Sequence, residues 1–260
     1  MSGFDLGWLD LREPADLAAR DTGLLRRAAD HLDATASPVT VDLGCGSGST
    51  FRALAPRLAR RPVWRLVDND PALLAEAGRR AGPDQAMVKI AADLADLDPS
   101  WFDGAALVTA SALLDLTSEA WIEALAERLA AAGAGLYAAL SYDGEMGWAE
   151  PHALDEAVTA AFNAHQRSDK GFGPALGPDA AKTAADRLKA QGFEVSIASS
   201  PWRLGPGEAE LERQLVAGIA QAAAETARVD GVEAWRDFRL GRAGSGCVVG
   251  HQDLLALPGS

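Results

Sequence analysis

A glycine-rich stretch, VTVDLGCGSGST at residues 39–50, constrains the fold more than any other part of the chain. Residues 39–43 form an apolar run that is typical of a buried strand. The apolar residues that follow the stretch recur at helical spacing: Phe51, Leu54 and Leu58. The glycines therefore lie in a strand-to-helix turn, where the missing Cβ atoms permit unusual dihedral angles and close approach of a ligand. Such a turn at the carboxyl edge of a parallel sheet predicts a small-ligand site.

Short apolar runs alternate with longer segments of helical periodicity along the rest of the chain, which is the pattern of βαβ units. Strands are expected at residues 39–43, 63–68, 86–91, 105–110, 134–141, 193–198 and 247–256. Helices are expected at about 14–35, 48–61, 71–82, 118–132 and 207–228. We therefore predict an α/β, Rossmann-like fold with a seven-stranded, mostly parallel sheet and helices on both faces.

The 260 residues are expected to form a single domain. Residues 1–36 would be an N-terminal helical cover, and 37–141 the core that contains the glycine turn. Residues 142–177 are predicted to form a lid insertion, because the segment DKGFGPALGP cannot continue a helix. Residues 178–260 would complete the sheet, with a helical insertion at about 207–240.

Composition argues against several classes of protein. The 37 acidic and 24 basic residues give a net charge of -13, which repels nucleic acid. No segment approaches the ~20 apolar residues of a membrane span, and the first residues lack the pattern of a signal peptide. The two cysteines and four histidines do not have the spacing of a disulfide framework or a metal site. We expect a cytoplasmic protein, a monomer or homodimer, with no metal, membrane or nucleic-acid partner.

The glycine turn differs from two common nucleotide-binding motifs. Counted from Gly44, the sixth position of a dinucleotide G-x-G-x-x-G pattern is Ser49, and no lysine follows the glycines as in a P-loop. VDLGCGSGS instead resembles the first motif of class I S-adenosylmethionine-dependent methyltransferases. The resemblance covers residues 37–141 and continues more weakly to the end. It implies the fold of that family, with the last strand antiparallel, and S-adenosylmethionine (SAM) as the cofactor.

The resemblance also implies which residues of the turn would meet SAM. Gly44, Cys45 and Gly46 would pass beneath the methionine part of the cofactor. Asp42, two residues before the first glycine, would orient the loop and the ammonium group. An acidic rim suits the ammonium and sulfonium charges of SAM better than it suits a pyrophosphate.

The ends of the next two predicted strands carry acids at the positions that the family uses for adenosine. By this resemblance Asp68 would accept both ribose hydroxyls, and Asn69 would lie beside the adenine. Asp93 would accept the adenine amino group, and Leu94 would pack near the ring. These acid-bearing strand ends, in this order, are a stronger signal than the glycines alone.

Three further residues complete the expected cofactor site. By resemblance, Ala110 and Ser111 after the fourth strand would line the methionine moiety and face the methyl acceptor. Arg20, on a helix expected to begin near Pro14, is a fitting partner for the cofactor carboxylate. A surface salt bridge from Arg20 to Asp16 or Glu13 is the alternative.

Methyl transfer is an in-line displacement in which the protein aligns the acceptor with the methyl group and excludes water. A base is needed only where the acceptor must lose a proton. Candidates for that role or for acceptor contacts are Tyr142, His152 and His165, in or beside the predicted lid. Packing in the core or the lid is the alternative for His165, and a turn is the alternative for Tyr142. His152 lies near the start of the predicted helix and is freer.

Together these observations predict SAM-dependent O- or N-methylation of a small-molecule acceptor. The fourth strand lacks the proline- and aromatic-bearing tetrapeptide found in methyltransferases of nucleic-acid bases and glutamine, which argues against those substrates. Two alternatives stay open, because fold does not dictate function. One is a cofactor-binding protein without catalysis, and the other is an NAD(P)-dependent oxidoreductase.

Overall fold

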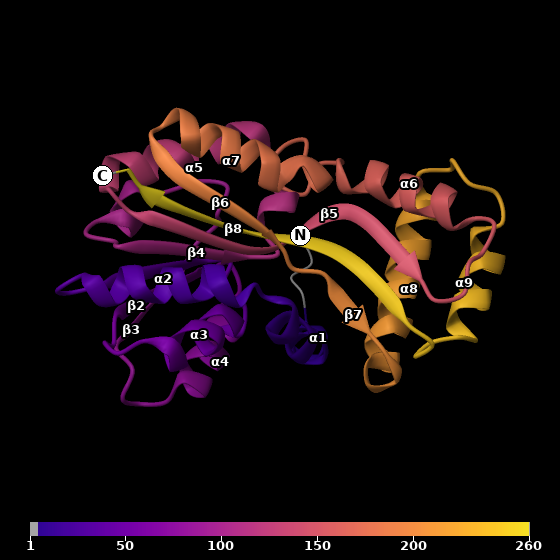
Figure 1. Cartoon of the computed structure of the whole chain (residues 1–260), viewed down its shortest axis with the longest axis horizontal. Coiled ribbons are helices and arrows are strands. Elements are labelled where there is room, and N and C mark those ends of the chain that lie inside the picture. The colour runs from indigo at the N-terminus through magenta and orange to yellow at the C-terminus, as the bar shows by residue number, and fades with distance from the viewer. Residues whose placement is uncertain (1–4, 260) are drawn as a thin grey trace.

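The structure is a computed structural model that describes residues 5–259, and it places one sheet between two layers of helices (Figure 1). The strands are β1 (Val39–Leu43), β2 (Val63–Asp68), β3 (Met87–Ala91), β4 (Leu107–Ser111), β5 (Gly135–Trp148), β6 (Phe193–Ser199), β7 (Trp202–Leu204) and β8 (Cys247–Pro258). The α-helices are α1 (Leu6–Ala19), α2 (Thr22–Ala34), α3 (Ser49–Leu54), α4 (Pro71–Ala81), α5 (Glu119–Ala132), α6 (Asp155–Gln166), α7 (Ala180–Ala190), α8 (Ala209–Glu225) and α9 (Val232–Leu240).

The strand order is β3-β2-β1-β4-β5-β8-β6, with β7 beside β8. Strands β1 to β5 are parallel, and β8 is antiparallel to its neighbours β5, β6 and β7. The predicted mostly parallel sheet with an antiparallel last strand is confirmed. Strand β7 was not predicted, because three residues are too few to show an alternating pattern.

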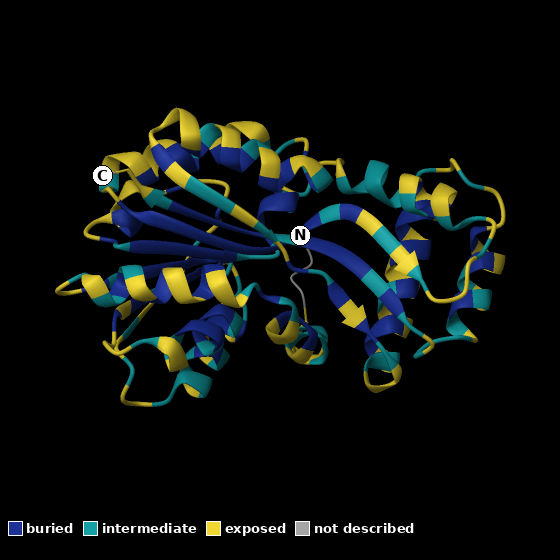
Figure 2. Ribbon diagram, in the orientation of Figure 1, coloured by how far each residue is buried: buried dark blue, intermediate teal, exposed yellow. Residues whose placement is uncertain are grey.

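The core of the sheet is buried on both faces (Figure 2). Helices α2, α3 and α4 cover one face, and the side chains of Leu32, Leu54 and Leu74 pack there around Trp64. Helices α5 and α7 cover the other face. Strands buried on two sides read as near-continuous apolar runs, which is why β1, β4 and the first half of β5 were visible in the sequence.

Strands β5 and β8 continue past the core and carry a second group of helices (Figure 1). We call this part the distal lobe, and define it as residues 142–166 and 202–252. In it, α6 packs against α8, and α8 against α9. The predicted lid was expected to begin at residue 142, but residues 142–148 extend β5 instead. They do so because β8 satisfies their backbone hydrogen bonds, with Tyr142 opposite His251.

The N-terminal helix predicted at about 14–35 is two helices. Helix α1 begins much earlier, where the Asp5 side chain accepts the amide of Trp8. The chain breaks after Ala19, since Arg20 adopts an extended ψ of 134°. Asp21 then caps α2 by accepting the amide of Leu24 at 2.7 Å. This break brings α1 away from α2 and toward the carboxyl edge of the sheet.

Three further observations concern the described part of the chain. Between residues 5 and 259, no helix combines the length and the apolar character needed to cross a membrane. The same residues contain no group of three or more histidine, cysteine or acidic side chains placed to hold a metal ion. Cys45 and Cys247 are both buried free thiols.

Candidate functional site

The glycine turn after β1 has the backbone that its sequence predicts. Gly44 and Gly46 have φ angles of +63° and +52°, in a region of backbone conformation that residues other than glycine rarely adopt. The amides of Gly44 and Cys45 both donate to the carbonyl of Val67 in β2, at 2.9 and 3.2 Å. These bonds fix the turn against the end of the neighbouring strand.

Asp68, the last residue of β2, supports the turn directly. Its Oδ2 accepts the amide of Gly46 at 2.8 Å, and its Oδ1 accepts the amide of Asp70 at 3.0 Å. Each carboxylate oxygen has a further lone pair with which to accept a ligand hydroxyl. Asp70 itself caps α4, because it accepts the amides of Ala72 and Leu73.

A cavity opens at the carboxyl edge of the sheet, between the strand ends and α1. Eight of the residues expected to bind the cofactor line it: Gly44, Cys45, Gly46, Asp68, Asn69, Asp93, Leu94 and Ser111. They come from the ends of four strands that lie side by side in the order β3-β2-β1-β4. The tertiary structure therefore brings together what the sequence showed as separate strand ends.

Three of the expected cofactor residues do not line the cavity: Ala110, Asp42 and Arg20. Ala110 is buried within β4. Asp42 is also buried, and its Oδ1 accepts the hydroxyl of Thr109 at 2.7 Å. Burial raises the pKa of Asp42 to about 7, against the opposing effects of Thr109 and the Arg20 charge. Asp42 thus does not line the cavity.

Arg20 is buried, with only 3% of its surface exposed. Its Nη2 donates to Ser111 Oγ at 2.9 Å, and Ser111 lines the cavity. Within residues 5–259, its Nε and Nη1 find no hydrogen-bond partner. The surface salt bridge considered as an alternative is not formed by Arg20, because Asp16 pairs with Arg12 and Glu13 pairs with Arg52. A buried guanidinium with free donors requires an anionic or polar partner.

Helix α1 forms a wall of the cavity that sequence analysis described only as a cover. Leu9, Arg12 and Asp16 of α1 line the cavity, and Phe172 lines it from the loop after α6. The spacing of these α1 residues fits one helix face, but a polar residue on an amphipathic helix is more often on the solvent side. Sequence alone therefore gave no sign that Asp16 faces a ligand site.

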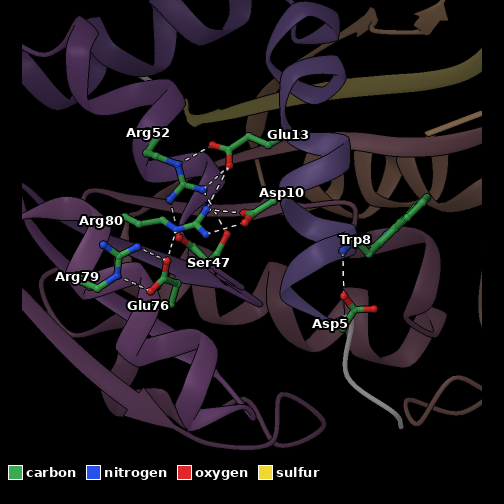
Figure 3. Close-up of polar contacts among 9 residues, drawn as sticks. All are labelled: Asp5, Trp8, Asp10, Glu13, Ser47, Arg52, Glu76, Arg79 and Arg80. Atoms are coloured by element: carbon green, nitrogen blue, oxygen red, sulfur yellow. Dashed lines mark hydrogen bonds and ion pairs between the residues drawn. The ribbon is translucent and has the colours of Figure 1, made fainter. Parts of the chain in front are cut away.

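Ion pairs dock α1 onto the core, as Figure 3 shows. Arg52 of α3 donates to both carboxylate oxygens of Glu13, at 2.5 and 2.6 Å. The same guanidinium donates to the carbonyl of Ser47 in the glycine turn at 2.5 Å. A second bidentate pair joins Asp10 to Arg80 of α4, at 2.6 and 2.9 Å. Arg52 thus links α1 to the turn, whereas Arg80 links α1 to α4 alone.

The three residues expected to act in catalysis do not line the cavity. The Tyr142 hydroxyl donates to Asn163 at 2.8 Å within the distal lobe. His165 contacts Glu225 at 3.0 Å, and the His152 ring packs on Phe238 with 4.6 Å between centroids. His152 thus packs on an aromatic ring and His165 contacts an acidic side chain, both within the distal lobe. Sequence placed them near the cavity because it took the segment after residue 141 for a lid.

Comparison with solved structures gives the same architecture. The YcgJ protein of Bacillus subtilis aligns with 92% of this chain and 100% of its own, at 11% identity and a TM-score of 0.51. The cyclopropane synthase MmaA2 of Mycobacterium tuberculosis aligns with 90% of this chain and 83% of its own, at 13% identity and a TM-score of 0.50. A geranyl diphosphate methyltransferase in complex with SAM aligns with 96% of this chain and 90% of its own, at 16% identity and a TM-score of 0.46.

The fold is that of the class I SAM-dependent methyltransferases, as the motif resemblance implied. At identities of this size the likeness establishes the fold alone. No model of a protein family matches the sequence, and no curated protein matches it.

Proposed function

We propose that this protein transfers a methyl group from SAM to a small-molecule acceptor. One observation carries the proposal: the ends of three adjacent strands deliver a glycine turn and two acidic side chains, Asp68 and Asp93, to a single cavity. Ligands of open α/β sheets bind at this edge. The acidic side chains favour a cationic ligand, and SAM carries an ammonium and a sulfonium group.

The residues of the cavity fit the adenosine part of SAM. Asp68 keeps lone pairs for ribose hydroxyls although it already accepts two amides. Asn69, Asp93 and Leu94 follow along the wall and would meet the adenine. Leu94 is buried, so it offers the ring an apolar surface.

Arg20 shows whether this part of the structure fits the methionine end of SAM. Its Nε and Nη1 are buried without partners within residues 5–259, and it lies behind Ser111 at the cavity wall. A carboxylate is the partner that a guanidinium binds most strongly. The carboxylate of SAM would neutralise this buried charge, so the orphaned nitrogens are consistent with the proposed ligand.

Methyl transfer requires the protein to align the reacting groups and to exclude water from them. When bound, SAM supplies an electrophilic methyl group on its sulfonium. Leu9, Leu113, Leu116 and Phe172 line the cavity and would exclude water from the reacting atoms. The glycine turn holds its shape through Asp68 and Val67, so the position offered to the methyl donor is preorganised.

Calorimetric titration tests the proposal. The protein is expected to bind SAM and S-adenosylhomocysteine, and to show no binding of NAD under the same conditions. Binding of NAD without SAM would instead favour the oxidoreductase alternative. Tight binding of SAM with no methylation of any metabolite pool would favour a binding protein without catalysis.

Asp68→Ala is expected to weaken S-adenosylhomocysteine binding by about 1–3 kcal/mol, because it orphans the ribose hydroxyls and the amide of Gly46. Titration calorimetry measures the change. Asp70→Ala is the matched control, since Asp70 caps α4 and does not line the cavity. An affinity unchanged in Asp68→Ala would show that the adenosine lies elsewhere.

Glu13→Gln is expected to weaken S-adenosylhomocysteine binding about fivefold, equivalent to roughly 1 kcal/mol for a partly exposed ion pair. The glutamine side chain carries no charge, so the ion pair between Arg52 and α1 is lost, whereas the hydrogen bond from Arg52 to Ser47 remains. Asp10→Asn removes the other ion pair, which does not reach the glycine turn, and should change the affinity less than twofold. Equal losses in the two variants would contradict a specific role for the link through Arg52.

A further inference from the structure

Three side chains outside the cavity, Lys170, His165 and Glu225, contact one another in a row. Lys170 lies in the loop after α6, His165 lies near the end of α6, and Glu225 is the last residue of α8. Lys170 Nζ lies 3.4 Å from His165 Nδ1, and His165 Nε2 lies 3.0 Å from Glu225 Oε2. None of the three lines the cavity. An amine beside an imidazole that a carboxylate orients is the arrangement of an activated nucleophile.

Hydrogen bonds determine which nitrogen of His165 carries the proton. Glu225 Oε1 accepts from the Gln221 side chain at 3.2 Å, and this bond together with the contact to His165 lowers the pKa of Glu225. Glu225 is therefore ionised at neutral pH and can only accept, so His165 Nε2 must donate to it. In the neutral ring Nδ1 then has no proton, and its lone pair faces the amine of Lys170.

The backbone on both sides of Lys170 is held in place. The preceding Asp169 accepts the amides of Gly171 and Gly173 through one oxygen, at 2.7 and 3.1 Å. Lys170 is partly buried, and this burial lowers its pKa, whereas the charge of Glu225 opposes the change. A larger fraction of its amine is therefore unprotonated at neutral pH than in a fully exposed lysine.

The chain has only three other lysines, Lys89, Lys182 and Lys189, and all of them are exposed. Lys182 pairs with Asp186 at 3.1 Å. Among the residues that the structure describes, a histidine accepts a hydrogen bond from Lys170 but from none of these three. One lysine therefore has a base beside it, and three lysines of the same chain serve as controls.

We infer that Lys170 is a site of acylation, at which a thioester transfers its acyl group to the side-chain amine. The ammonium first passes a proton to His165 Nδ1, and Glu225 stabilises the imidazolium that forms. As the bond from nitrogen to the acyl carbon forms, the bond from that carbon to sulfur breaks. The leaving thiolate takes the second proton of the nitrogen, and His165 releases the first to water. The products are an amide, a thiol and a proton, so atoms and charge balance.

Charge favours a thioester over an acyl phosphate as the donor. Both carry an activated acyl carbon, but an acyl phosphate is anionic and would approach Glu225 on a chain of net charge -13. A thioester has no charge at its reacting group. The acyl group would be attached two residues before Phe172, on the loop that forms part of the cavity wall.

Acetylation of the full chain with S-acetyl-N-acetylcysteamine, an uncharged thioester, tests the inference. Peptide mass spectrometry follows the acetylated fraction of all four lysines over time at neutral pH. Lys170 is expected to react at least about tenfold faster than each of the other three. General base catalysis contributes about 100-fold or more, and the lower exposure of Lys170 offsets part of that gain. With acetyl phosphate, the preference for Lys170 should be smaller.

Variants show whether the preference comes from the base. His165→Gln keeps a polar side chain without a basic nitrogen, and it is expected to slow acetylation of Lys170 about tenfold while the other lysines stay within about twofold. His152→Gln, also in the distal lobe, is the matched control and should match the wild type at every lysine. Glu225→Gln should slow Lys170 as well, because the imidazolium loses its carboxylate. Glu210→Gln changes an exposed acid on the same helix and should not.

Each outcome supports or overturns the inference. It is wrong if Lys170 reacts no faster than the other lysines in the wild type, or if the preference persists in His165→Gln. A larger preference with acetyl phosphate would overturn the thioester as the donor. If His165→Gln changes the rates of all four lysines, the variant has altered the fold, and the wild type with Glu225→Gln decides. These results do not depend on S-adenosylhomocysteine binding, so this inference and the proposed function are tested separately.

Discussion

Arg239→Ala is expected to lower the free energy of unfolding of the distal lobe by about 3 kcal/mol, because it removes a buried guanidinium that pairs with the partly exposed Asp155. Arg239 of α9 is 2% exposed. Its guanidinium pairs with Asp155 at the start of α6, donates to the carbonyl of Glu150 at 2.7 Å, and lies 4.4 Å from the centre of the Trp148 ring. One side chain thus joins the end of β5 to two helices, and its loss leaves Asp155 without its cation.

Calorimetric unfolding measures this loss, and Arg236→Ala on the same helix is the control. Arg236 is exposed and pairs only with its neighbour Asp237, so its removal should cost less than about 0.5 kcal/mol. Binding of S-adenosylhomocysteine should stay within twofold of wild type in both variants, because neither residue lines the cavity. A melting temperature equal in Arg239→Ala and Arg236→Ala would contradict the proposed role of the buried pair.

Asp253→Ala is expected to destabilise the protein by about 3 kcal/mol or more and also to weaken cofactor binding. Asp253 of β8 is fully buried and accepts three hydrogen bonds, from the amide of Asp21, the hydroxyl of Tyr137 and the amide of Leu140. Each donor left unsatisfied costs about 1–3 kcal/mol. Asp21 follows Arg20 directly, so the same change releases the turn that positions the Arg20 guanidinium.

Two measurements check this expectation together. The melting temperature of Asp253→Ala should fall by about 6–12 °C for a chain of this size. The affinity for S-adenosylhomocysteine should fall as well, which Arg239→Ala should not show. Asp30→Ala, an exposed acid on α2, is the control and should change neither quantity. A variant that melts like the wild type would mean that the three donors find other partners.

The sequence predicted the sheet well because its strands carry local signals. Buried parallel strands read as apolar runs, and glycines and caps mark their ends, as Asp70 does before α4. The signals failed where an element depends on a distant partner. The extension of β5 to Trp148 exists because β8 pairs with it, although β8 follows about a hundred residues later in the chain. His152 and His165 were placed at the cavity because of that error.

The cofactor residues were predictable for the same reason that the strands were. Gly44, Asp68 and Asp93 stand at strand ends, and parallel strands bring their carboxyl ends to one edge. No comparable rule predicts which residues from other parts of the chain reach the cavity. Asp16 looks like an ordinary surface residue in the sequence, and only its burial at the cavity distinguishes it.

The amino-acid sequence by itself determined the α/β class, the strand-to-helix glycine turn and the acidic strand ends, because each depends on the chemistry of neighbouring residues. The tertiary structure decided which other side chains meet at that turn. It turned α1 into a wall of the cavity, buried Arg20 behind Ser111, and placed His152 and His165 in the distal lobe. These outcomes depend on contacts between residues far apart in the chain, and a local pattern does not encode such contacts.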